Sequence, residues 1–165
     1  METERLMIRV PTIEDFDGLY LVHADPETNI FNPGWKKPSK EEFMQSLSSI
    51  IEHHNQHGFG YYALVDKEDN KVFGICGLRY TKINNETFLN LYYRISPSKM
   101  RRGFVKEAAN KIIEDVTKKL NNKYKIVVVT LAENIKSRKT AESLGLKYKK
   151  EFDNIDGEGN VYYFN

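Results

Sequence analysis

Several features that mark specialised protein classes are scarce in this chain. Cys76 is the only cysteine, which excludes an intramolecular disulfide framework and a cysteine-rich metal site. No apolar run approaches the roughly 20 residues that a membrane-spanning helix needs. The charged start, Met1 to Arg5, has no apolar stretch after it, so a secretory signal is not indicated. These absences predict a cytoplasmic protein with no membrane partner.

An excess of charge of one sign is also lacking. The 25 Lys and Arg residues nearly balance the 23 Asp and Glu residues, for a net charge of +2, and the two kinds are interspersed. A nucleic-acid-binding domain usually gathers its basic residues on one face, so nucleic acid is not an expected partner. A basic RNA-contacting domain stays open as a third function class, and it predicts steeply salt-dependent binding.

What is present is enough for a folded core. The 165 residues match one ordinary domain, and 40% of them are hydrophobic. We find no internal repeat, low-complexity tract or linker, which predicts a single domain over residues 1–165. Cys76 lies within the apolar run from Val72 to Leu78 and is expected to be a small buried core residue.

The first 60 residues predict a strand and two helices. Residues 6–10 form the strand, and residues 13–22 a helix that Thr12 can cap. The Pro- and Gly-containing segment 25–38 is irregular. Ser39 and Glu42 form a capping box that opens a helix to about residue 54.

The remainder alternates strands and helices. The predicted elements are strands 60–65, 71–79 and 87–96, a helix at 103–120, a strand at 126–129, a helix at 137–144, and strands 149–154 and 161–165. An antiparallel meander followed by a strand–helix–strand–helix unit indicates a mixed α/β (α+β) sheet with helices packed against it.

The segment from Tyr92 to Ala108 carries the clearest chemical signal. A strand ends there, Pro97 follows, and a helix opens around Gly103. The first N–H groups of a helix have no intrahelical partner and bind anions, and a glycine lets a phosphate approach closely. Arg101 and Arg102 add positive charge. Taken alone, the same pattern also describes a turn with solvated charges.

This loop resembles the acetyl-coenzyme A pyrophosphate loop of GNAT acetyltransferases, Gln/Arg-x-x-Gly-x-Gly/Ala after a strand and a proline. Gly103 falls on the central glycine and Pro97 on the proline. Met100 stands where Gln or Arg is usual, and Val105 where Gly or Ala is usual. The resemblance implies acetyl-coenzyme A as co-substrate, held by a weakened or reshaped loop.

Further segments resemble the RimJ/RimL-type branch of that family. They are Phe104 to Ala108, Asn134 to Ser137 with Glu142 to Leu146, His57 to Leu64, and the start Thr3 to Arg9. The resemblance covers nearly the whole chain. It implies a central, mostly antiparallel twisted sheet of about seven strands with four helices. That sheet would be splayed between the two strands that flank the cofactor-loop helix.

The resemblance also implies which residues bind the cofactor. They are Tyr93, Ile95, Met100, Arg101, Arg102, Gly103, Phe104, Val105, Asn134 and Ser137. Strand residues 91–95 would face the pantetheine arm and pair with it as an added strand does. Asn134 and Ser137 would approach the thiol end, while Asn134 can equally be a helix cap.

The implied chemistry is direct acetyl transfer from a thioester to an amine. An amine with a pKa of about 10.4 needs a base, and the departing thiolate benefits from a hydroxyl donor. Ser137 is the candidate donor, or it caps its helix. Asn90 stands where many family members have a Glu and can hold a water, and Asp153 is a carboxylate within possible reach or a surface charge. Ala141 replaces the Tyr of other branches.

Aromatic and histidine residues complete the candidates. Four aromatic side chains are candidates for the acceptor pocket or for the core: Trp35, Phe31, Tyr61 and Tyr62. We favour the pocket for Trp35 and Tyr62 and the core for Phe31 and Tyr61. The three histidines between residues 53 and 57 have no carboxylate or cysteine partner in the sequence pattern. We therefore expect solvated or substrate-side roles and no metal.

The leading function is an N-acetyltransferase that uses acetyl-coenzyme A in a ternary complex. Its acceptor would be a primary amine, either a protein N-terminus or a small molecule such as a polyamine or amino sugar. The alternative is a non-catalytic acyl-coenzyme A-binding module, because Asn90, Met100 and Val105 depart from the family pattern. A monomer or a homodimer is expected.

Overall fold

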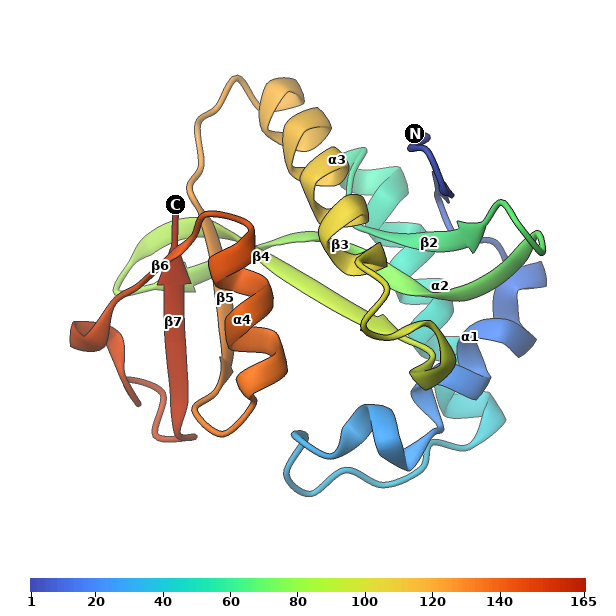
Figure 1. Cartoon of the computed structure of the whole chain (residues 1–165), viewed down its shortest axis with the longest axis horizontal. Coiled ribbons are helices and arrows are strands. Elements are labelled where there is room, and N and C mark those ends of the chain that lie inside the picture. The colour runs from blue at the N-terminus through green and yellow to red at the C-terminus, as the bar shows by residue number, and fades with distance from the viewer.

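A single seven-stranded sheet forms the centre of the structure, a computed structural model that describes residues 1–165 (Figure 1). The spatial order is β1-β2-β3-β4-β5-β7-β6, and every neighbouring pair is antiparallel except β4 and β5. The strands are β1 (Leu6–Arg9), β2 (Tyr61–Asp66), β3 (Lys71–Ile83), β4 (Glu86–Ile95), β5 (Ile126–Leu131), β6 (Lys147–Tyr148) and β7 (Asn160–Phe164). The predicted α+β class with a mostly antiparallel sheet is confirmed.

Four α-helices follow the predicted order. They are α1 (Phe16–His23), α2 (Lys40–His57), α3 (Phe104–Lys119) and α4 (Ile135–Ser143). The predicted capping box opens α2, because Ser39 Oγ accepts from the Glu42 N–H at 3.1 Å and Glu42 Oε2 accepts from the Ser39 N–H at 2.7 Å. No helix has both the length and the apolar character needed to cross a membrane.

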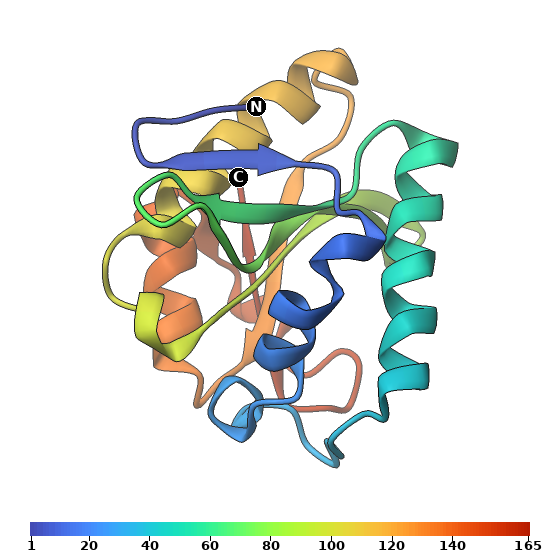
Figure 2. The same cartoon turned by 90° about the vertical axis from the view of Figure 1, so that its right-hand side faces the viewer.

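The two faces of the sheet carry different helices. On one face α3 and α4 pack over the largest core cluster, with Phe104, Ile112 and Ala141 against Leu78 and other strand residues. Cys76 belongs to the same cluster and is fully buried, as predicted. On the opposite face α1 and α2 close a smaller cluster around Leu19, Leu47 and Ile75. Figure 2 shows α1 and α2, in blue and cyan, lying together in front of the strands.

The pairing between β4 and β5 stops after two residue pairs. Leu89 pairs with Ile126 and Asn90 with Val127, and no pairing joins the two strands beyond that point. β5 instead pairs along its length with β7, from Val127 to Leu131. Figure 1 shows β4 and β5 diverging from where they meet. The predicted splay is therefore confirmed, and it leaves one edge of residues 91–95 without a neighbouring strand.

The predicted strand at residues 149–154 is wrong. Strand β6 ends at Tyr148, and Lys150–Phe152 form a 3-10 turn instead. The reason lies in packing, because the Phe152 ring contacts Phe164 at a centroid distance of 4.8 Å and also lies against Tyr162. An apolar anchor that folds back onto the sheet face is incompatible with an extended backbone at this edge.

The last residue of α1 makes stability depend on pH. The His23 ring packs on Phe43 with centroids 5.0 Å apart, and its Nδ1 donates to the Leu19 carbonyl at 2.8 Å. Burial lowers the pKa of His23 to about 4, and the nearby Arg94 acts in the same direction. In the unfolded chain the same side chain titrates near its ordinary value of about 6.5.

We expect the His23→Gln variant to be less sensitive to acid than the natural chain. Between about pH 6.5 and 4 the unfolded state binds a proton that the folded state excludes, so stability is lost as the pH falls through that window. His23 should contribute a loss of about 2 kcal/mol in the free energy of unfolding between pH 7 and pH 5. Gln should remove most of that contribution and keep a donor for the Leu19 carbonyl. Urea unfolding at both pH values measures it. Exposed His57→Gln is the control, and an equal pH slope in natural chain and variant would contradict the assignment.

Candidate functional site

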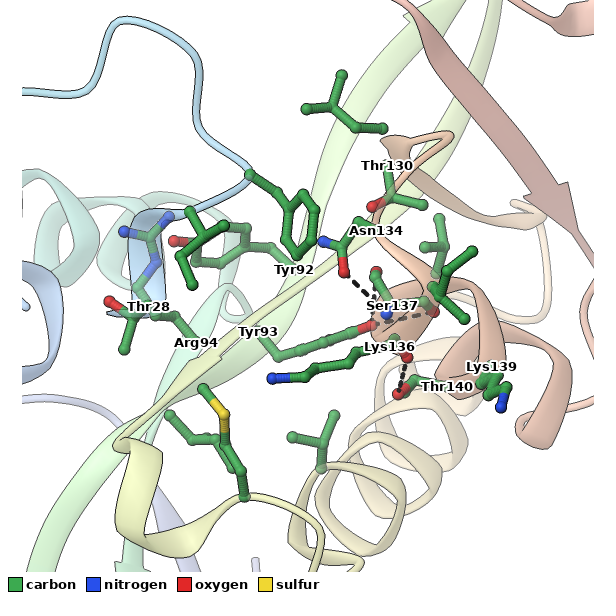
Figure 3. Close-up of a pocket in the computed structure, with 18 of the residues that line it drawn as sticks. Thr28, Tyr92, Tyr93, Arg94, Thr130, Asn134, Lys136, Ser137, Lys139 and Thr140 are labelled. Atoms are coloured by element: carbon green, nitrogen blue, oxygen red, sulfur yellow. Dashed lines mark hydrogen bonds between the residues drawn. The ribbon is translucent and has the colours of Figure 1, made fainter. Parts of the chain in front are cut away.

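A long cleft of about 1010 Å³ lies where β4 and β5 diverge (Figure 3). Its walls come from residues 91–95 of β4, residues 128–131 of β5, the loop and first turn of α3, and one side of α4 from Ile135 to Ser143. Residues 27–33 and the loop before β7 contribute to its rim. The cleft thus runs from the N-terminus of one helix to the N-terminus of another.

The α3 end of the cleft has the backbone geometry of an anion-binding site. The backbone N–H groups of residues 101–106 have no acceptor within the protein. Arg101 and Gly103 have φ values of +60° and +78°, whereas Arg102 between them has a negative φ, and such an alternation turns successive N–H groups toward one point. A Cβ on Gly103 would lie 3.5 Å from Arg5 Nη2, so backbone conformation rather than space requires the glycine. The positive end of the helix dipole adds to this field.

Fixed charges support the same end of the cleft. Arg101 and Lys106 line it and form no ion pair. Lys99 also lines it, but its Nζ lies 2.7 Å from the buried Asp66 and 3.1 Å from Asp69. Lys99 therefore fastens the loop to the β2–β3 turn, while the other two cations remain available to a ligand.

A clamp ties the first turn of α3 to the N-terminal segment. Glu107 accepts from Thr3 Oγ1 at 2.6 Å, from the Arg5 N–H at 3.0 Å and from Arg5 Nε at 2.7 Å. The Arg5 guanidinium also donates to the Arg102 carbonyl at 2.8 Å and lies over the Phe104 ring. Partial burial acts to raise the pKa of Glu107, but the bonds from Thr3 and Arg5 hold it below its ordinary value. Through Arg5, the clamp therefore holds the loop at the carbonyl group of Arg102.

The α4 end brings two hydroxyl groups together. Asn134 Oδ1 accepts from the Ser137 N–H at 3.1 Å, so Asn134 caps α4 and lines the cleft at once. The Tyr93 hydroxyl, projecting from β4, lies 2.8 Å from Ser137 Oγ (Figure 3). Burial raises the pKa of Tyr93, although Ser137 and Thr140 act to lower it, so the phenol stays protonated at neutral pH. Ala141 is buried, and the phenol that contacts Ser137 comes from β4.

Asn90 marks the apex between the diverging strands. It is the last β4 residue that pairs with β5, and it lies opposite Arg79 of β3. Its Oδ1 is buried and has no hydrogen-bond partner in the protein. A buried carbonyl oxygen of this kind is an acceptor in need of a donor.

The neighbours of Tyr93 on β4 face the other way. Tyr92 and Arg94 lie on the opposite side of the strand from Tyr93 (Figure 3). There they help to line a second cleft of about 830 Å³ between the sheet, α2 and the segment before α2. Trp35, expected in an acceptor pocket, lines this second cleft.

Nine of the ten residues expected to contact a cofactor line the first cleft, and the exception is Arg102. The Arg102 side chain turns outward, with Nη2 3.6 Å from Glu68 Oε2 and the guanidinium over the Phe104 ring. Phe104 itself is 1% exposed, so its side chain is part of the core and its backbone N–H faces the loop.

Two further candidate residues, Tyr62 and Asp153, lie outside both clefts. Tyr62 is buried against the His54 ring, at a centroid distance of 4.6 Å, and lines neither cleft because β2 turns it toward the α3 face. Asp153 lies at the outer edge of the sheet, where Tyr148 donates to its carboxylate, and it is outside both clefts. The 3-10 turn after β6 carries Asp153 away from the apex.

The histidines of α2 do not gather into a metal site. No group of three His, Cys, Asp or Glu side chains lies close enough to hold an ion. The rings of His53 and His57 lie 4.4 Å apart, and His54 Nε2 contacts the Tyr61 carbonyl at 3.0 Å. These residues pack where the end of α2 meets the strands.

Two arginines of the candidate site were not predicted from the sequence. Arg79 and Arg94 both line the second cleft from the interior of β3 and β4. The available signal was an arginine within an otherwise apolar strand run, at positions that alternate with core residues. Tyr93 was assigned to the cofactor, but its contact with Ser137 depends on how far β4 leans toward α4, which no local pattern specifies.

Comparisons with known proteins agree with this geometry. The family model described as an acetyltransferase (GNAT) domain matches residues 5–147. An acetyltransferase from Agrobacterium tumefaciens is similar in structure with a TM-score of 0.80 at 21% identity, over 100% of this chain and 92% of that one. The ribosomal-protein-S5-alanine acetyltransferase from Vibrio fischeri gives 0.74 at 20%, over 100% and 94%. The microcin C7 self-immunity acetyltransferase MccE, in complex with acetyl-CoA and AMP, gives 0.78 at 15%, over 99% and 93%. At these identities the structural likeness concerns the fold.

The Glu107 clamp leads to a stability prediction. The Glu107→Gln variant keeps the shape and one acceptor oxygen but removes the charge that Arg5 faces, and the loss should be about 1 kcal/mol because Arg5 is partly exposed. Urea unfolding at neutral pH measures it. Glu114→Gln, on the exposed side of the same helix, is the control. Equal stability of the two variants would show that the clamp contributes nothing measurable.

Proposed function

Because this chain belongs to the acetyltransferase (GNAT) domain family, we propose that it is an N-acetyltransferase that moves acetyl from acetyl-coenzyme A to a primary amine. One observation carries the proposal. A single cleft connects the free N–H groups at the start of α3 with the paired hydroxyls of Tyr93 and Ser137, passing the unpaired edge of β4. Its two ends suit the two chemically distinct ends of an acyl-coenzyme A.

The pyrophosphate would accept hydrogen bonds from the loop N–H groups, with Arg101 and Lys106 as counter-charges. The amide groups of the pantetheine arm would pair with the free edge of residues 91–95, as an added strand pairs with a sheet edge. This arrangement would place the thioester near the start of α4. Met100 and Val105, the two residues that differ from the loop pattern of the family, also line the cleft.

The acceptor nitrogen would attack the thioester carbonyl carbon, forming the C–N bond and a tetrahedral oxyanion. Collapse of that intermediate breaks the C–S bond, and the electron pair leaves on sulfur as a thiolate. In the Tyr93–Ser137 pair one hydroxyl donates to the other, so the remaining proton is free to pass to the thiolate. The attacking amine gives up its proton to water, which Asn90 Oδ1 can hold at the apex.

The branch within the family and the acceptor belong to this proposal. The RimJ/RimL-type motifs, together with the fold likeness to a ribosomal-protein acetyltransferase, support a protein N-terminus as acceptor. The alternative acceptor is a small-molecule amine. A non-catalytic acyl-coenzyme A-binding module is the second candidate function, favoured by the neutral Asn90 at the apex. Binding of acetyl-coenzyme A without transfer to any amine of a broad panel would select it.

We expect the Gly103→Val variant to bind acetyl-coenzyme A at least about 10-fold more weakly. A β-branched residue at a φ of +78° costs about 1–2 kcal/mol, so the loop would relax and its N–H groups would no longer converge. Calorimetric titration measures the dissociation constant.

Gly145→Val is the matched control, since Gly145 has a φ of +83°, open space around it and no place in the cleft. It should lose similar stability and keep its affinity. Absence of binding in the natural chain would overturn the proposed function itself.

The hydroxyl pair leads to a kinetic prediction. Tyr93→Phe should lower kcat about 10- to 100-fold, because the thiolate would leave without its proton donor, and the KM for acetyl-coenzyme A should change less. Ser137→Ala should have a comparable effect, and the double variant should be little worse than either single one, since the two hydroxyls act as a unit. Tyr124→Phe, outside both clefts, is the control. Additive losses in the double variant would rule out a shared proton path.

A further inference from the structure

The second cleft lies on the α1/α2 face of the sheet and adjoins the first. Tyr92 and Arg94 of β4 line both cavities, so a molecule in the second cleft reaches the diverging strands across these two side chains. Its floor is the sheet, and its walls are α2 and the segment with Trp35. The proposed binding of acyl-coenzyme A in the first cleft does not use this cavity.

The charged side chains that line the second cleft are mostly positive. Lys36, Lys37, Arg79 and Arg94 line it, against Glu42 as the one acid. The Glu42 carboxylate is already engaged with the N–H of Ser39 at the start of α2. None of the four cations forms an ion pair within the protein. In a chain whose net charge is only +2, this concentration attracts anions.

Arg79 carries the most specific signal. Its Nε and Nη2 are both buried and without a hydrogen-bond acceptor. These two nitrogens form one edge of the guanidinium, the planar fork that matches both oxygens of a carboxylate. Arg79 faces Asn90 across the strand pair, and the neutral amide brings no counter-charge. A buried guanidinium without an acceptor is costly, which favours any ligand that supplies an anion.

The neighbours of Arg79 allow that fork to reach the cleft. The guanidinium stacks 4.3 Å above the Tyr61 ring, whose centroid lies 5.0 Å from that of Tyr92, with Arg94 beyond it. Arg79 makes no hydrogen bond through the two buried nitrogens, so a rotation of its side chain toward the cavity breaks none there. Arg94 is held more firmly, because it donates to the buried Asn29.

We infer that the second cleft is the acceptor subsite and that it selects amines that also carry a carboxylate, with Arg79 as the group that binds this anion. The inference rests on the proposed function and narrows its acceptor class. The amine would extend over Tyr92 toward the apex at Asn90, while the carboxylate stays at Arg79. An acceptor with a neutral or cationic tail would leave the guanidinium unpaired.

Three four-carbon amines test this selection at constant length: 4-aminobutyrate, butylamine and 1,4-diaminobutane. For the natural chain, kcat/KM should be about 10- to 100-fold higher for 4-aminobutyrate than for butylamine, the range expected of charge-assisted hydrogen bonds. Arg79→Gln should remove most of this preference, and Arg79→Lys should restore part of it. The 3-aminopropylphosphonate analogue shows whether another oxyanion is accepted. Lys82→Gln, an exposed cation on the same strand, is the control.

A second measurement does not depend on turnover. The ¹⁵N-detected Nε–H resonance of Arg79, assigned from its loss in Arg79→Lys, should shift saturably when 4-aminobutyrate is added and should not shift with butylamine. If no amine is acetylated, the proposed function fails, and this titration still decides the anion site. Equal kcat/KM values for the three amines, a preference that persists in Arg79→Gln, or an unmoved Nε–H signal would each overturn the inference.

Discussion

The early end of the β4–β5 pairing is the constraint on which the rest of this structure depends. Two pairs, Leu89 with Ile126 and Asn90 with Val127, join the halves of the sheet, after which the strands separate. Unpaired strand edges are normally a liability, and here β7 covers the far side of β5 while the edge of residues 91–95 lies open to the cleft. That open edge makes room for an extended ligand inside a sheet that otherwise satisfies its own backbone.

The period of two along β4 divides the chemistry between the faces. Tyr93 turns toward α4 and meets Ser137, whereas Tyr92 and Arg94 turn toward α1 and α2. One strand therefore separates a hydroxyl pair suited to a leaving thiolate from a cationic cavity suited to an acceptor. Asn90, at the apex, lies where the two sides meet. In the proposed function, the local geometry of this single strand would bring two substrates to one point from opposite sides of the sheet.

The loop at the start of α3 depends on contacts that are distant in the sequence. Its left-handed residues direct the N–H groups, but the Arg5–Glu107 clamp and the Lys99–Asp66 pair hold its position. Both ties join the loop to the first strands of the sheet. Met100 and Val105, which depart from the family pattern, lie in this loop and line the cleft. The departures therefore change the side chains at the cleft, while the backbone of the loop keeps its arrangement.

The order of elements, the helix caps at Ser39 and Asn134, and the start of a helix after the loop around Gly103 were all determined by the sequence alone. Each depends on residues close together in the chain, where periodicity and capping act. The turn after β6, the core position of Tyr62, the outward course of Arg102 and the remoteness of Asp153 were decided only by tertiary packing. So were the meeting of Tyr93 with Ser137 and the unpaired fork of Arg79. The physical reason is common to all of these. A side chain's partners depend on which face its strand presents and on what the opposite layer places there, and neither is written in local sequence.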